Sequence, residues 1–110
     1  MVGVMLATVV LLADARDEVP NTIQVIAKRY SFTPDQITVK RGQVVTLSLR
    51  SLDVTHGLSI KELGIKTGIP KGRDTVVSFT PQAVGTFVGQ CSHFCGSGHG
   101  SMKFTVVVTE

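Results

Sequence analysis

After residue 18, apolar and polar residues alternate in short runs, and turn-forming residues separate these runs about every 8 to 12 positions. Alternation with a period of two puts every second side chain on one face of a β-strand, whereas an amphipathic helix needs a period of about 3.6 residues. No segment after residue 18 carries a helical apolar stripe of useful length. The pattern predicts strands at residues 22–28, 36–40, 43–50, 57–60, 63–66, 74–79, 86–90 and 103–108.

Turn signals indicate how these strands connect. The short turn at residues 41–42 predicts a β-hairpin between the strands on either side of it, with Val45, Leu47 and Leu49 on one face. Residues 31–35 read as a turn and not as a strand. Many short strands with regular turns and no helix are typical of an all-β sandwich, which is the predicted fold class.

The first thirteen residues are apolar except for Thr8, and the chain then turns polar up to residue 18. Thirteen helical residues span about 20 Å, short of the roughly 30 Å hydrocarbon core, so no complete transmembrane helix is expected. The length suits the apolar core of a signal peptide, and Ala13-Asp14-Ala15 is similar to a cleavage site, although no basic residue precedes it. The alternatives are the last turns of a membrane anchor and an ordinary first strand. We expect export or membrane association through this segment.

A length of 110 residues leaves room for one domain, which we assign to residues 19–110, behind an apolar N-terminal segment at residues 1–18. Hydrophobic residues make up 43% and charged residues 17%, which excludes intrinsic disorder. With 2 Cys, at most one disulfide can form, so the fold must depend on a hydrophobic core. The net charge of +3 comes without a dense basic cluster or an aromatic platform, so nucleic acid is not an expected partner.

The candidate chemistry lies between residues 91 and 102, which hold both Cys, two of the 3 His and one of the 3 Met. Cys91, Cys95, His99 and Met102 follow one another as C-x3-C-x3-H-x2-M between two predicted strands. Thiolate, imidazole and thioether are the soft and borderline ligands that copper selects over hard cations. His56, just before an upstream strand, can add a fourth side-chain ligand if it faces this loop across the end of the sandwich.

Two other interpretations of the same residues stay open. The two Cys can form a disulfide if the loop bends, which would leave a metal-free interaction domain. Zinc is satisfied by two Cys and two His in tetrahedral geometry, but structural zinc gains little from a Met at a fixed offset. The Met, together with a sandwich that needs no metal to fold, favours copper.

Residues 51–58, with the sequence SLDVTHGL, precede the loop of residues 91–102 by some 35 positions. Together they resemble the dinuclear copper (CuA) cupredoxin domain of cytochrome c oxidase subunit II, whose site also occurs in nitrous oxide reductase. The resemblance runs from about Asn21 to Glu110, includes the turn at residues 32–34, and is nearest to the compact subunit II of B-type (ba3-like) oxidases. It implies a Greek-key cupredoxin fold.

The resemblance also implies a ligand set, residue by residue. Cys91 and Cys95 would each bridge both coppers. His56 and Met102 would complete one copper, and His99 with the backbone carbonyl of His93 would complete the other. A second Cys discriminates against mononuclear blue copper, which uses one Cys, two His and a weak Met.

Asp53 would hold the His56 loop by hydrogen bonds, as carboxylates commonly do around metal-bound imidazoles. The sequence departs from the mitochondrial-type subunit II at three points. His93 replaces a Glu that helps to hold magnesium there, no Trp is present to serve as an electron entry point, and the acidic residues are too scattered to attract a cationic cytochrome c. Docking is therefore expected to be mainly apolar or to involve a less basic partner.

The resemblance implies a periplasmic one-electron carrier that performs no bond chemistry itself. It would accept electrons from a c-type cytochrome or another small redox donor and pass them to the catalytic subunit of a haem–copper oxidase in a respiratory chain. The alternatives are a free-standing copper-delivery protein with the same ligands and a domain related to nitrous oxide reductase, which needs a further large copper domain.

Overall fold

Strand β4 (Val45–Ser51) shows how the alternating sequence becomes structure. In the computed structural model, which describes residues 21–110, buried and half-buried side chains alternate along its whole length. Val45, Leu47 and Leu49 are fully buried on one face, as the sequence predicts. The strand lies inside a sheet of order β2-β1-β4-β7, parallel to β1 and antiparallel to β7.

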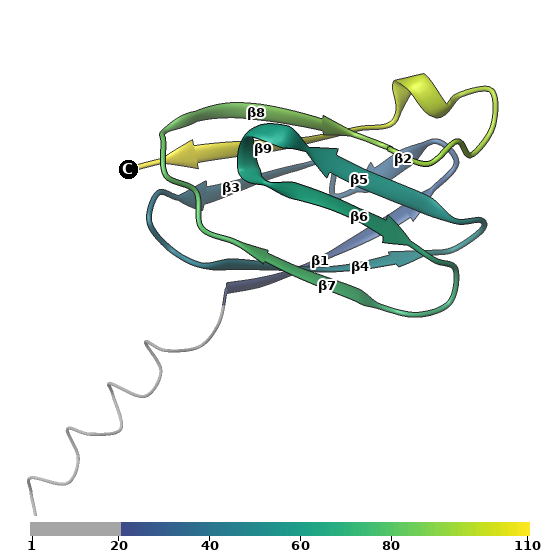
Figure 1. Cartoon of the computed structure of the whole chain (residues 1–110), viewed down its shortest axis with the longest axis horizontal. Coiled ribbons are helices and arrows are strands. Elements are labelled where there is room, and N and C mark those ends of the chain that lie inside the picture. Colours follow the sequence, from purple (N-terminus) through teal and green to yellow (C-terminus); the bar gives the residue numbers. More distant parts are fainter. Residues whose placement is uncertain (1–20) are drawn as a thin grey trace, which may run out of the picture.

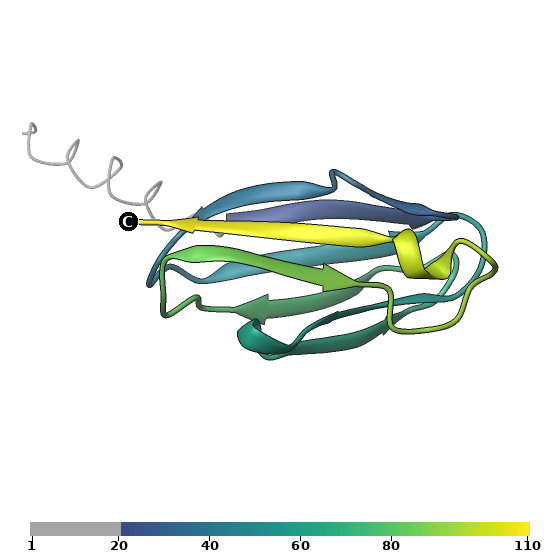
Figure 2. The ribbon, with the colours of Figure 1, turned by 90° about the horizontal axis from the view of Figure 1, so that it is seen from above.

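Two sheets pack face to face in the described part of the chain (Figures 1 and 2). The first sheet contains β1 (Asn21–Lys28), β2 (Ser31–Thr33), β4 and β7 (Thr75–Phe79). The second, of order β3-β9-β8-β5-β6, contains β3 (Gln36–Lys40), β5 (His56–Ile60), β6 (Ile65–Ile69), β8 (Gly85–Gln90) and β9 (Lys103–Thr109). Two 3-10 turns, η2 (Lys61–Leu63) and η3 (His99–Ser101), complete these elements. The all-β sandwich prediction is confirmed.

The predicted hairpin around residues 41–42 is wrong. Strands β3 and β4 lie in different sheets, because β3 pairs in parallel with β9 while β4 pairs with β1 and β7. The Arg41 backbone N–H donates to the Thr109 carbonyl and the Gly42 N–H donates to the Pro81 carbonyl, each at 2.8 Å. The turn therefore carries the chain from one sheet to the other. Alternation identifies the buried face of each strand, but it does not identify the neighbouring strand.

The structure differs from two further sequence predictions. Residues 31–35 were expected to form a turn, but Ser31–Thr33 pairs with the end of β1 as the short strand β2. The strand expected at residues 63–66 starts at Ile65, because η2 occupies Lys61–Leu63 and is followed by Gly64, whose φ of +71° suits glycine. The predicted N-terminal segment lies outside the described residues. Within residues 21–110, no helix is long and apolar enough to cross a membrane.

The core fills the space between the two sheets. Phe32 and Phe104, one from each sheet, pack edge to face with ring centroids 5.9 Å apart and an interplanar angle of 64°. Leu47 and Leu58 are fully buried beside them in the same cluster. At one end of the sandwich the cluster continues into Cys91, Cys95 and Met102, so the sulfur side chains belong to the core.

One end of the sandwich collects the segments that carry the candidate chemistry (right-hand end in Figure 1). The β1–β2 turn, the β4–β5 loop and the long β8–β9 loop all lie there. Asn21 and Glu110 lie at the opposite end, because β1 runs toward the loops and β9 runs away from them (Figure 1). The fold thus separates the ends of the described chain from the candidate site.

Replacing Leu47 by Ala tests whether the inner face of β4 stabilises the sandwich. We expect the free energy of unfolding of the metal-free protein to fall by about 2–5 kcal/mol, because the change opens a cavity in the core. Val76→Ala in β7 of the same sheet is the matched control, since its side chain is 63% exposed. Urea denaturation measures both variants, and equal losses would contradict the assigned core.

Candidate metal centre

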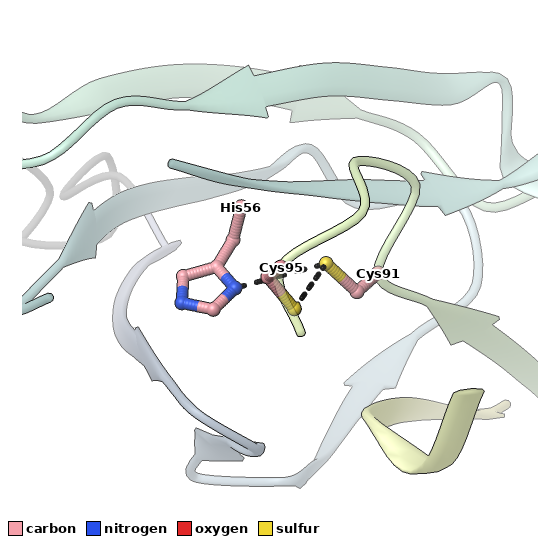
Figure 3. A group of neighbouring side chains, drawn as sticks. All are labelled: His56, Cys91 and Cys95. Carbon is pink, nitrogen blue, oxygen red and sulfur yellow. Dashed lines mark hydrogen bonds between the residues drawn. The ribbon is translucent and has the colours of Figure 1, made fainter. Parts of the chain in front are cut away.

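His56 and Cys91 come from neighbouring strands and meet inside the end of the sandwich. His56 begins β5, Cys91 follows the last residue of β8, and these strands pair at Ser59 and Gln90. His56 is fully buried, and its Nδ1 lies 3.8 Å from the Cys91 Sγ. The Cys95 Sγ joins them, and the three donor atoms lie within 4.8 Å of one another (Figure 3).

The two sulfur atoms are neighbours without being bonded. The Cys91 and Cys95 Sγ atoms are 3.8 Å apart, nearly twice the length of a disulfide bond of about 2.05 Å. Both residues are free cysteines with buried side chains. The disulfide interpretation of the sequence therefore does not describe this arrangement, which leaves both sulfurs available as donors.

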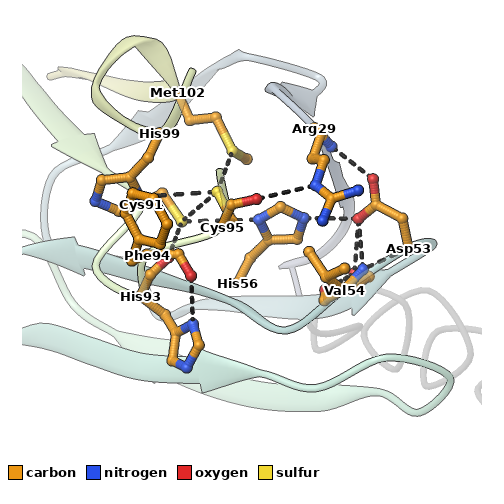
Figure 4. Close-up of polar contacts among 11 residues, drawn as sticks. Arg29, Asp53, Val54, His56, Cys91, His93, Phe94, Cys95, His99 and Met102 are labelled. Carbon is orange, nitrogen blue, oxygen red and sulfur yellow. Dashed lines mark hydrogen bonds and ion pairs between the residues drawn. The ribbon is translucent and has the colours of Figure 1, made fainter. Parts of the chain in front are cut away.

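The rest of the β8–β9 loop adds three more donor atoms to the same group. The His99 Nδ1 lies 3.7 Å from the Cys95 Sγ, and the fully buried Met102 Sδ lies 3.6 Å from it. The Cys91 thiol donates to the backbone carbonyl of His93 at 3.2 Å. Figure 4 shows these atoms facing a common centre. The structure thus brings together all six donor atoms that the sequence singled out.

The imidazole of His93 does not face this centre. Its residue is exposed, and its Nδ1 lies 3.1 Å from the carbonyl oxygen of Phe94 (Figure 4). Only the backbone carbonyl of His93 belongs to the donor group, which is the arrangement that the sequence resemblance implies. The side chain instead borders a surface pocket of about 300 Å³ beside Cys95.

Asp53 determines which ring nitrogen of His56 faces the sulfurs. The His56 Nε2–H donates to the Asp53 Oδ1 at 2.8 Å, which leaves Nδ1 with its lone pair toward Cys91. The backbone N–H groups of Arg29 and Val54 also donate to this carboxylate, at 2.8 and 2.7 Å. Burial acts to raise the pKa of Asp53, but these hydrogen bonds outweigh it and hold the pKa well below its usual value. Asp53 therefore stays ionised.

The Cys95 thiol, unlike the Asp53 carboxylate, is uncharged in the metal-free protein. Burial, followed by the neighbouring Cys91, raises the pKa of Cys95 to about 11, so this residue is a thiol at neutral pH in the metal-free protein. A metal ion binds the thiolate and must displace the proton. The site thus has a permanent anion behind His56 and a neutral thiol, that of Cys95, among the donors in front of it.

The donor set discriminates among metal ions. Two thiols, two imidazoles and a thioether are soft or borderline ligands, which calcium and magnesium do not favour. Zinc would use the four Cys and His donors, but it leaves no role for the buried thioether of Met102. Copper uses every one of these ligand types, so the residues fit copper best.

Close packing holds the ligand loop against β5. A Cβ on Gly57, next to His56, would lie 3.1 Å from the Thr67 carbonyl oxygen and 3.3 Å from the His93 nitrogen, and would collide with the Ser92 hydroxyl. Glycine therefore lets the loop approach the strand that carries His56.

Arg29 is a residue of the site that the sequence analysis missed. Its Nε–H donates to the Cys95 carbonyl at 2.9 Å, across 66 positions of sequence. No local motif signals such a contact, because the residues meet only after the two sheets have packed.

The comparisons with known proteins agree with this geometry. Residues 16–109 match the family of the cytochrome c oxidase subunit II periplasmic domain. Cytochrome c oxidase subunit 2 of Thermus thermophilus is 30% identical over 89 residues, which cover 81% of this chain and 66% of that relative. The chain spans about half to two thirds of the length of the Thermus relatives that it matches.

Solved structures share the fold. The periplasmic domain of cytochrome oxidase subunit II from Bradyrhizobium japonicum has a TM-score of 0.75 and 23% identity, covering 81% of this chain and 83% of that one. Auracyanin A, a "blue" copper protein from Chloroflexus aurantiacus, has a TM-score of 0.66 and 18% identity, covering 83% and 100%. The predicted cupredoxin-like fold is confirmed, and the periplasmic family domain places the chain on the extracytoplasmic side. The chain belongs to the family of the cytochrome c oxidase subunit II periplasmic domain.

Proposed function

We propose that this domain carries single electrons through a dinuclear CuA centre, from a c-type cytochrome or a similar donor to the catalytic core of a haem–copper oxidase. The observation that carries the proposal is the pair of buried sulfurs 3.8 Å apart, with a His56 nitrogen 3.8 Å from one sulfur and a His99 nitrogen 3.7 Å from the other. A mononuclear blue copper site uses one Cys, and a second buried Cys in the same donor group supports two metals. When bound, such a pair of coppers takes up and releases one electron.

The chain's own contribution is to hold the donor atoms rigidly and to bury most of them. His56 and Met102 are fully buried, and Cys91 and Cys95 are only 3% and 5% exposed. Strands β5, β8 and β9 anchor the segments that carry them. A rigid and largely buried ligand frame changes little between oxidation states, so electron transfer meets a low reorganisation barrier.

We further propose that the domain, which carries a net positive charge, docks its partners through an apolar surface at Phe94. Phe94 supports this role because its side chain is 73% exposed and its ring lies 5.6 Å from the His99 ring, centroid to centroid. From residue 21 to 110 the chain has ten Lys and Arg against five Asp and Glu, and Asp74 and Glu110 pair with Arg50 and Arg41. A strongly cationic donor is disfavoured by this charge.

The compact B-type (ba3-like) group is the part of the family that we propose for this chain. The sequence has no Trp, the residue that the mitochondrial type uses as its electron entry point. His93 stands where the mitochondrial type has the Glu of a magnesium site, and its exposed imidazole points away from the donor group. Both departures support the B-type assignment.

Electron paramagnetic resonance of the copper-loaded full chain tests the dinuclear centre. We expect two coppers per chain and a seven-line hyperfine pattern, because one unpaired electron is shared by two metal nuclei. Cys95→Ser removes a sulfur shared by the donor group and should abolish this signal, while Ser101→Ala, an exposed change in the same loop, should keep it. A four-line spectrum and one copper in the unaltered protein would contradict the proposal. Rapid loss of Cu(I) to an acceptor would favour copper delivery instead.

His93→Ala separates the backbone role of this residue from a side-chain role. We expect the seven-line spectrum and both coppers to remain, because the carbonyl is kept and the imidazole lies at the surface. His99→Ala is the matched comparison, since its Nδ1 faces the Cys95 Sγ and its removal should change the spectrum. Loss of a copper from His93→Ala would show that its imidazole is a ligand.

Asp53→Asn tests the carboxylate behind His56. We expect copper affinity to fall about 10- to 100-fold, because the acceptor that orients the imidazole is weakened. Competition with a copper chelator measures the loss. Asp74→Asn removes a surface carboxylate paired with Arg50 and should leave the affinity unchanged. Equal affinities for the two variants would rule out a role for Asp53 in orienting the ligand.

A further inference from the structure

Arg29 touches two parts of the candidate metal centre that belong to different loops. Its backbone N–H donates to the Asp53 Oδ2 at 2.8 Å, and its side-chain Nε–H donates to the Cys95 carbonyl at 2.9 Å (Figure 4). Asp53 in turn accepts from the His56 Nε2–H at 2.8 Å. One residue therefore connects the loop that carries Cys95 to the carboxylate that orients His56.

The contact joins the two layers of the sandwich at the end where the ligands lie. Arg29 follows β1 of the first sheet, whereas Cys95 lies between β8 and β9 of the second sheet. The next residue, Tyr30, packs on the same loop. A Cβ on Gly98 would lie 2.5 Å from the Tyr30 Cδ2, and a Cβ on Gly96 would collide with the Tyr30 hydroxyl. The β1–β2 turn thus lies directly against the ligand loop.

The guanidinium is also a permanent positive charge beside the sulfur donors. Its Nε–H bonds to the backbone of Cys95 itself, so the charge lies next to a residue that supplies a sulfur donor. A cation beside the donor group favours a centre that has gained an electron, because the reduced centre carries one positive charge less than the oxidised one. Removing the cation should therefore favour the oxidised state.

We propose that Arg29 is a positioning residue that holds the ligand loop closed through Nε and, through its charge, raises the reduction potential of the centre. The inference rests on the proposed copper site for its redox part. Its loop-holding part concerns the metal-free chain alone. The two effects belong to different features of the side chain, the N–H donor and the charge, so substitutions can separate them.

Three variants of the full chain make the test. Arg29→Gln keeps a nitrogen donor at the same distance along the side chain and removes the charge. Arg29→Met has a similar stem and removes both the donor and the charge. Arg50→Met is the matched control, because Arg50 is a half-exposed cation near the same end of β4 whose Nε donates to the Asp74 Oδ1 at 2.8 Å.

The first measurement is amide hydrogen exchange in residues 92–101 of the metal-free protein. We expect Arg29→Met to speed exchange in this loop by about tenfold, as follows from losing a hydrogen bond to a loop carbonyl. Arg29→Gln and Arg50→Met should stay close to the unaltered protein. Exchange in Arg29→Gln as fast as in Arg29→Met would show that the Nε donor does not hold the loop, and would overturn this part.

The second measurement is the ratio of oxidised to reduced copper-loaded protein in a fixed redox buffer. We expect Arg29→Gln and Arg29→Met to raise this ratio by about three- to tenfold, because the interaction is with a partly solvated charge. Arg50→Met should change it little. Ratios for both Arg29 variants equal to that of Arg50→Met would overturn the electrostatic part.

The two measurements also separate this inference from the proposed function. A seven-line spectrum of the unaltered protein, together with unchanged loop exchange and an unchanged redox ratio in Arg29→Met, would refute the role of Arg29 and leave the dinuclear centre standing. A mononuclear spectrum of the unaltered protein, together with fast loop exchange in Arg29→Met, would refute the dinuclear centre and leave the loop-holding role of Arg29 standing.

Discussion

The constraint on which this structure depends is that six donor atoms from two separate segments, the start of β5 and the β8–β9 loop, must meet in the apolar end of a sandwich without covalent bonds to one another. Cys91 and Cys95 keep their sulfurs 3.8 Å apart, and His56 reaches them from another strand. Buried polar groups are costly unless each has a partner, and no buried side-chain nitrogen or oxygen of residues 21–110 lacks one. The pairing of β5 with β8 and the Asp53 carboxylate together satisfy this requirement.

Much of this arrangement could be predicted from the sequence because its signals are local. The alternation in Val45–Ser51 identifies the buried face, and the spacing of Cys91, Cys95, His99 and Met102 identifies the donor loop. The partner of each strand could not be predicted in the same way. The strands on either side of residues 41–42 looked like a hairpin, yet each finds its partners in a different sheet, because long-range packing and not the turn decides the pairing.

The residues that support the ligands were harder to find than the ligands themselves. Asp53 lies three positions before His56, within the segment that carries the family resemblance, and that resemblance indicates its role. Arg29 meets Cys95 only across the assembled sandwich, and an arginine after a strand carries no signal of such a contact. Ser51 is similar: it is buried at the end of β4 and accepts from the Asp53 backbone N–H at 3.2 Å, which a reading of polar residues as surface residues does not anticipate. Local sequence patterns thus identify the ligand residues more readily than the residues that hold those ligands in place.

The placement of Asn21 and Glu110, at the end of the sandwich opposite the donor group, bears on how the domain can be handled (Figure 1). A tether joined at Asn21 or Glu110 would leave the exposed Phe94 side chain free, whereas a tether joined to the β4–β5 or β8–β9 loop would cover it. An electrode or bead that holds the domain near Asn21 or Glu110 would therefore leave the donor group facing solution. The two ends of the sandwich thus differ in what they carry: the donor atoms lie at one end, and Asn21 and Glu110 lie at the other.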